Sequence, residues 1–88
     1  MVSFETIWKR IEAHQGEIFH QIRGQQFTYK VESGAVIPDT TNRQLPRSHF
    51  AEAAKLLPLR NTVPVQHLQG PSYLYAILMD RKIGQSDW

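Results

Sequence analysis

Eighty-eight residues, 41% of them hydrophobic and 20% charged, predict a single globular domain over residues 1–88 with a thin core. The absence of cysteine excludes disulfides, thiolate zinc sites and a cysteine nucleophile, and the net charge of +2 favours acidic partners only mildly. The first residues, MVSFETIWKRIE, are charged early and contain no long apolar run, so we expect no signal peptide, no membrane anchor and a cytoplasmic location.

The chain begins with a predicted amphipathic helix over residues 3–15. Ser3 occupies the N-cap position and Gly16 ends the helix. The apolar residues follow the i, i+3, i+4, i+7 spacing of one helical stripe: Phe4, Ile7, Trp8 and Ile11. This stripe is expected to pack against the strands that follow.

Three short strands are predicted next, over about residues 17–22, 26–32 and 35–38. Residues 26–32 alternate most clearly, with one apolar and one polar face. The connections between these segments are short, so the strands are expected to form an antiparallel meander.

The dipeptide at residues 33–34 predicts a tight hairpin turn, because its second residue is a glycine that adopts positive φ without cost. A two-residue turn here pairs Val31 with Val36 on the core face. The same register puts Ile37 beside Lys30 on the other face.

His20 alternates with Ile18 and Ile22 along the first predicted strand. We therefore expect a partly buried histidine packed among apolar neighbours. The reverse register would turn all three side chains toward solvent.

A second helix is predicted over residues 48–57, with Ser48 as its N-cap and Pro58 beyond its end. The segment that follows has no helical period. Val63 and Val65 are candidates for an edge strand in that segment.

A third helix is predicted over residues 71–81, with Pro71 at its first position and an apolar run from 73 to 79 that predicts burial. The tail 83–88 is expected to fray unless Trp88 docks on the fold. The expected fold class is α+β, with a small three-stranded antiparallel meander packed by three helices.

The sequence contains no constellation of residues that indicates catalysis or metal binding. The four histidines lie far apart, the acidic residues occur singly, and the five glycines are isolated. Ser48 and Ser72 stand in helix-cap positions without the surrounding pattern of a nucleophile. We therefore expect a non-enzymatic protein without a cofactor or a metal.

The two halves of the chain differ in charge. Residues 1–39 contain four Lys/Arg and five Asp/Glu, whereas residues 40–88 contain six Lys/Arg and three Asp/Glu. Arg43 and Arg47 come immediately before the second predicted helix, whose free N–H groups favour an anion. We therefore expect a small nucleic-acid-binding or regulatory domain that contacts the phosphates of DNA or RNA. The candidate contact residues are Arg43, Arg47, Ser48, His49, Lys55, Arg60 and Lys30.

The basic loop also has an alternative interpretation. In it, Arg43 and Arg47 are solubilising, or they pair with Asp39 and Glu52.

A protein-interaction module, either a homodimer or an accessory subunit, is the alternative function. Tyr73 and Tyr75 lie about 200° apart on a helix, so one of them faces outward. Tyr75 and Met79, at i and i+4, form the candidate protein interface. A more distant alternative is a small-molecule site among Trp8, Tyr29 and Tyr73.

Overall fold

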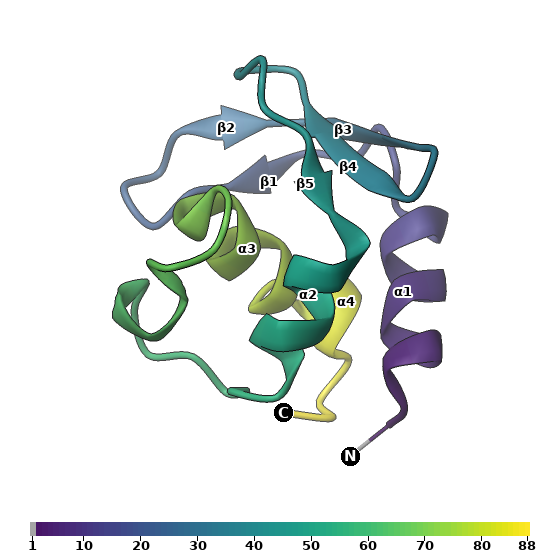
Figure 1. Ribbon diagram of the computed structural model, residues 1–88, viewed down its shortest axis with the longest axis vertical. Coiled ribbons are helices and arrows are strands. Elements are labelled where there is room, and N and C mark those ends of the chain that lie inside the picture. Colours follow the sequence, from purple (N-terminus) through teal and green to yellow (C-terminus); the bar gives the residue numbers. More distant parts are fainter. Residues whose placement is uncertain (1) are drawn as a thin grey trace.

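The computed structural model describes residues 2–88 and has the predicted α+β class. Its helices are α1 (Phe4–Ala13), α2 (Arg47–Ala54), α3 (Pro71–Leu78), α4 (Arg81–Gly84) and the short 3-10 helix η1 (Val63–Val65). Its strands are β1 (Phe19–His20), β2 (Gln26–Phe27), β3 (Tyr29–Glu32), β4 (Ala35–Pro38) and β5 (Leu45–Pro46). The helices lie on one side of the strands, as Figure 1 shows. The buried core therefore lies between the helices and the inner face of the strands.

The strands form two small antiparallel sheets. A three-stranded sheet is present as predicted, in the order β3-β4-β5, and β1 and β2 form a separate pair. The third strand of the larger sheet is β5, which lies in a segment expected to be a loop. The predicted strand 17–22 contributes only β1, which belongs to the separate pair. At Thr28, between β2 and β3, the backbone N–H donates to the Asp39 carboxylate at 2.9 Å and the carbonyl accepts from the Asp39 N–H at 3.0 Å. These bonds bridge the break between the two strands.

The hairpin between β3 and β4 has the predicted register. Val31 pairs with Val36, and Lys30 pairs with Ile37. Both turn residues have positive φ, 50° at Ser33 and 74° at the glycine that follows. Two successive positive φ values define the turn whose twist matches that of antiparallel strands.

The N-terminal helix α1 confirms the predicted cap and apolar stripe. The Ser3 side chain accepts the N–H of Thr6 at 3.3 Å, which satisfies a donor that the first helical turn leaves free. Ile7, Trp8 and Ile11 are buried. The helix ends at Ala13, three residues before the glycine that was expected to stop it.

Helix α2 begins one residue earlier than predicted, and Ser48 is not its N-cap. Pro46 occupies the cap position, and no side chain bonds to the first turn. The N–H of Arg47 instead donates to the carbonyl of Gly34 at 2.9 Å. A backbone contact with the hairpin turn therefore sets the start of this helix, which a local sequence pattern does not reveal. The helix also ends at Ala54, short of the predicted boundary.

The predicted third helix is divided in two. Helix α3 ends at Leu78, and the Asp80 side chain caps α4 by accepting the N–H of Lys82 at 2.8 Å. The tail does not fray, because the indole N–H of Trp88 donates to the carbonyl of Leu78 at 2.7 Å. The aromatic residue at position 88 therefore docks on the turn between the two helices.

The prediction for β1 and His20 was wrong, because the strand turns its other face to the core. Phe19 is fully buried, whereas Ile18 is 50% exposed and Ile22 is 52% exposed. His20 is likewise exposed. Burial of the larger aromatic side chain decides this orientation, since it removes more apolar area from water.

The segment before α3 forms η1 rather than an edge strand. Val65 is buried there, and Val63 is 65% exposed.

Within the described part of the chain, none of the helices has the length and apolar character needed to cross a bilayer.

Candidate functional site

The two arginines of the loop before α2 do not act together. Arg47 forms an ion pair with Glu5, and its guanidinium lies 5.0 Å from the ring centroid of Phe4 and 5.7 Å from that of Trp8. A cation in this position is attracted by the faces of the aromatic rings and by the carboxylate. Arg47 therefore attaches α2 to α1, and its charge is already compensated. The expectation that it would pair with Asp39 or Glu52 was wrong.

Arg43 points to a different part of the molecule. Its guanidinium Nη1 donates to the side-chain oxygen of Gln69 at 3.3 Å, and its backbone N–H donates to the Thr41 hydroxyl at 3.2 Å. Arg43 is exposed and forms no ion pair within residues 2–88. Its positive charge is therefore held in place by a neutral partner and stays available to an anion.

His49 also contacts the segment just before α3. Its Nδ1 accepts the backbone N–H of Gln69 at 3.0 Å, so that nitrogen is the unprotonated one. Ser48, the next candidate in the first turn of α2, is exposed. His49 thus positions the residue that holds Arg43, while Ser48 faces solvent.

The remaining basic candidates are dispersed. Lys55 lies 3.3 Å from Glu52, and Lys30 lies 2.7 Å from Glu32, both as exposed pairs. Arg60 is exposed and has no acidic partner among the described residues. Of the predicted cations, only Arg43 and Arg60 therefore keep an uncompensated charge.

Around the start of α3 the structure brings together residues that lie far apart in the sequence. One groove of about 430 Å³ is lined by Gln21, Ile22, Arg23, Gln25, Thr62, Gln66, Pro71 and Ser72. A second groove of about 410 Å³ is lined by Gln21, Gln25, Gln26, Thr40 and Tyr73. The two grooves share Gln21 and Gln25 and together form one feature, the amide groove. None of the residues that line it carries a carboxylate.

The loop that carries Arg43 is fixed against this groove. The hydroxyls of Thr40 and Tyr73 lie 2.7 Å apart. A Cβ added to Gly70, whose φ is +60°, would stand 2.7 Å from Leu45 Cδ2. Only glycine fits so close an approach at positive φ. The backbone before α3 and the loop at residues 39–44 therefore form one packed surface.

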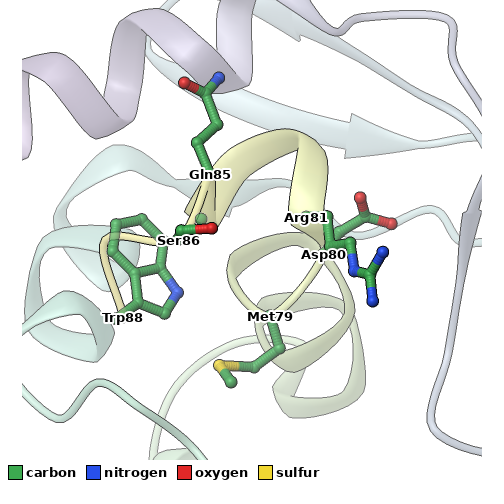
Figure 2. Close-up of a pocket in the computed structure, with 7 residues that line it drawn as sticks. Met79, Asp80, Arg81, Gln85, Ser86 and Trp88 are labelled. Atoms are coloured by element: carbon green, nitrogen blue, oxygen red, sulfur yellow. The ribbon is translucent and has the colours of Figure 1, made fainter.

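Another pocket lies at the end of the chain and has few unused polar groups. Figure 2 shows this pocket of about 570 Å³, between Trp88 and the start of α4. Asp80 caps α4 and lies 3.3 Å from Lys82 Nζ, and the indole N–H is bonded to a backbone carbonyl. Arg81, the other charged side chain of the lining, has no acidic partner within the described chain. The amide groove offers more unused donors and acceptors.

The predicted protein interface and the predicted aromatic gap are largely filled. Tyr75 and Met79 are half-buried and pack against the core, and Met79 Sδ accepts the N–H of Leu59 at 3.4 Å. Trp8 packs edge-on against Phe50 at a centroid distance of 5.9 Å. The aromatic side chains therefore form part of the core. A separate finding is that the described residues contain no group of three or more side chains that could hold a metal ion.

Two features of the sequence point to the amide groove. Glu52 is the only acidic residue between positions 40 and 79, and QIRGQQ at 21–26 concentrates amides beside Arg23. Only the fold shows that these stretches meet. Comparisons with protein-family models, with curated proteins and with solved structures returned no match.

Proposed function

We propose that this protein is a small nucleic-acid-binding domain whose contact surface is the amide groove together with Arg43 and Arg60. The observation that carries the proposal is a groove that combines an arginine, several amides and hydroxyls without any carboxylate in its lining. Such a lining attracts phosphates and supplies neutral donors and acceptors for sugars and base edges.

The cations of this surface are suited to the phosphate backbone. Arg23 lines the groove, Arg43 is held by Gln69, and Arg60 precedes the groove residue Thr62 by two positions. Each phosphate that an arginine neutralises releases counterions, so affinity falls as salt rises. A guanidinium already held by a neutral partner also loses less side-chain freedom on binding.

The amides give the surface a chemistry beyond charge. A glutamine side chain both donates and accepts, and it forms paired hydrogen bonds with base edges. Gln21 and Gln25 border both parts of the groove. A nucleic-acid strand that follows the groove would therefore contact amide groups along its length.

The start of α2 is not included in this proposal, although the sequence suggested it. Arg47 is compensated by Glu5, and Lys55 by Glu52. An anion there would have to compete with an existing carboxylate, which weakens its attraction. Lys30 is excluded for the same reason, because it pairs with Glu32.

The test measures binding of a labelled oligonucleotide of about 16 nucleotides, as single-stranded DNA, single-stranded RNA and duplex, over a series of salt concentrations. We expect binding at low salt, and each of Arg23→Ala and Arg43→Ala should reduce the salt slope by about 1. Arg81→Ala is the matched control, since it removes the same charge from an exposed arginine of α4.

The outcomes separate site binding from general attraction to a basic protein. Equal losses for the control and for Arg43→Ala would overturn the amide groove as the site. Absence of any complex at low salt would overturn nucleic-acid binding altogether. Circular dichroism of each variant establishes that the fold is intact.

The competing proposal is a protein-interaction module that uses Tyr75 and Met79. It has weaker support, because both side chains already pack against the core. Analytical ultracentrifugation discriminates the homodimer form: a dimer that Met79→Lys dissociates would favour this proposal over nucleic-acid binding.

A further inference from the structure

The outer face of the strands carries two adjoining hollows that the amide groove does not include. One, of about 350 Å³, is lined by residues that include Lys30, Ile37, Pro38 and Asp39. The other, of about 250 Å³, is lined by Ile18, Gln26, Phe27, Thr28 and Asp39. Thr28 and Asp39 line both, so they form the border between the two hollows.

Asp39 is held in a fixed position at this border. Its Oδ1 accepts the N–H of Thr28 at 2.9 Å, and its own N–H donates to the carbonyl of Thr28 at 3.0 Å. The second carboxylate oxygen, Oδ2, makes no hydrogen bond to residues 2–88. Its position is therefore set by the backbone, while half of its acceptor capacity is unused.

The charge of Asp39 is also uncompensated. It forms no ion pair with any described residue, in contrast to its charged neighbours. Lys30 pairs with Glu32 at 2.7 Å, and Glu17 lies 2.8 Å from His14 Nδ1. A cation that bound at this border would therefore contact a carboxylate that is not already paired with a cation of the described chain.

Apolar side chains stand on both sides of this carboxylate. Ile18 is 50% exposed in one hollow, because β1 turns Phe19 inward. Ile37 is partly exposed in the other, on the face opposite the core. In Figure 1 the helices lie on the other side of the strands and leave this face uncovered. The order along the surface is therefore apolar, anionic, apolar.

We propose that these two hollows bind an extended segment of a partner protein in which a lysine or arginine has an apolar residue two positions away on either side, since alternate side chains of an extended chain point to the same face. Charge complementarity with Asp39 selects the central residue, and the hollows beside Ile18 and Ile37 take the apolar residues. Nucleic acid is disfavoured here, because the same carboxylate repels phosphates. Gln26 borders both this site and the amide groove, so Asp39 also marks where the nucleic-acid surface ends.

The experiment uses a blocked heptapeptide, Ser-Leu-Ser-Arg-Ser-Leu-Ser, titrated into the full chain while backbone amide resonances are followed by NMR. We expect saturable shifts at Thr28, Ile37 and Asp39. The peptides Ser-Leu-Ser-Glu-Ser-Leu-Ser and Ser-Ser-Ser-Arg-Ser-Ser-Ser test the charge and the apolar residues separately. Equal binding of either one would overturn the proposed pattern.

Asp39→Asn removes the charge and keeps an oxygen that accepts the Thr28 N–H. We expect this variant to bind the arginine peptide with about tenfold lower affinity, because one pairwise charge interaction is lost. Glu32→Gln is the matched control, because it removes a carboxylate of the same strands that is already paired. Retained binding by Asp39→Asn, or equal loss in the control, would overturn the site.

The same variant keeps this inference separate from nucleic-acid binding. Asp39→Asn should leave oligonucleotide affinity unchanged or raise it, since a negative charge at the edge of the amide groove is removed. Loss of peptide binding with retained oligonucleotide binding supports the peptide site. Loss of both would overturn it in favour of a disturbed fold.

Discussion

The guanidinium of Arg10 lies 2.7 Å from the carboxylate of Asp87 and joins α1 to the segment after α4. The same side chain donates to the carbonyls of Ile83 at 3.0 Å and Gly84 at 3.3 Å, so it satisfies acceptors that the end of α4 leaves free. Arg10 is only 16% exposed. One side chain therefore connects the first and the last helix of the fold.

Arg10→Ala is expected to lower the free energy of unfolding by about 2 kcal/mol, because charge-assisted bonds to two carbonyls and a carboxylate are lost together. Asp87→Asn should cost less, about 0.5 kcal/mol, since it removes only the more exposed partner. Urea denaturation measures both values. Lys9→Ala, an exposed neighbour on α1, is the control, and a similar loss there would contradict the role given to Arg10.

Arg47 is expected to affect stability rather than nucleic-acid binding. Removing its guanidinium from Phe4, Trp8 and Glu5 should lower the free energy of unfolding by about 1 kcal/mol, discounted for its partial exposure. Arg47→Lys should recover part of this loss, because the charge remains without the planar group. Urea denaturation and the oligonucleotide salt series test the two halves of the prediction. A larger change of salt slope for Arg47→Ala than for Arg43→Ala would contradict it.

Gly70→Ala is expected to destabilise the fold more than Gly24→Ala. Both glycines have positive φ, +60° and +88°, so alanine is strained at each by about 1 kcal/mol. A Cβ at position 70 would in addition collide with Leu45, whereas one at position 24 meets nothing within 4 Å. The difference between the two unfolding free energies, measured in urea, isolates the collision. Equal values would show that Leu45 moves aside without lowering the free energy of unfolding.

Tyr29 makes the fold sensitive to alkaline pH. Burial raises the pKa of Tyr29 well above its ordinary value, and the charges of Glu17 and Asp80 raise it further. The folded chain therefore holds the phenolic proton more tightly than the unfolded chain. This contribution to stability is fully present below about pH 10, the ordinary tyrosine pKa, and is lost as pH rises above it.

Tyr29→Phe tests this linkage. The variant loses the hydrogen bond from the hydroxyl to the carbonyl of Ile11, 2.6 Å long, so it should be less stable at neutral pH by about 1 kcal/mol. Its further loss of stability above about pH 10 should be shallower than that of the parent protein. Urea midpoints at neutral and alkaline pH measure the slopes. Tyr75→Phe serves as the control, and an identical slope in the Tyr29 variant would refute the assignment.

Local pattern was sufficient for the elements whose signals lie within a few residues. The Ser3 cap and the buried face of α1 follow from helical spacing, and the hairpin register follows from the two-residue turn at 33–34. The α+β class follows from the same periodicities. These features depend on contacts between near neighbours in the chain, which is why the sequence contains them.

The candidate site was predicted less well, because its residues are distant in sequence. The charge asymmetry pointed to the second half of the chain, where Arg43 forms no ion pair with a described residue. Arg23 and the glutamines at 21–26 joined it only through packing against the start of α3. Arg47 lies four residues after Arg43, but it contacts Glu5 and two aromatic rings of α1.

The sequence by itself determined helix α1, the hairpin register and the excess of cations after residue 39, since these depend on residue type and short spacing. Tertiary structure decided which face of β1 is buried, because Phe19 excludes more water than Ile18 or Ile22. It likewise decided which charges remain free. An ion pair forms wherever folding brings opposite charges together, and that proximity comes from packing rather than from order along the chain.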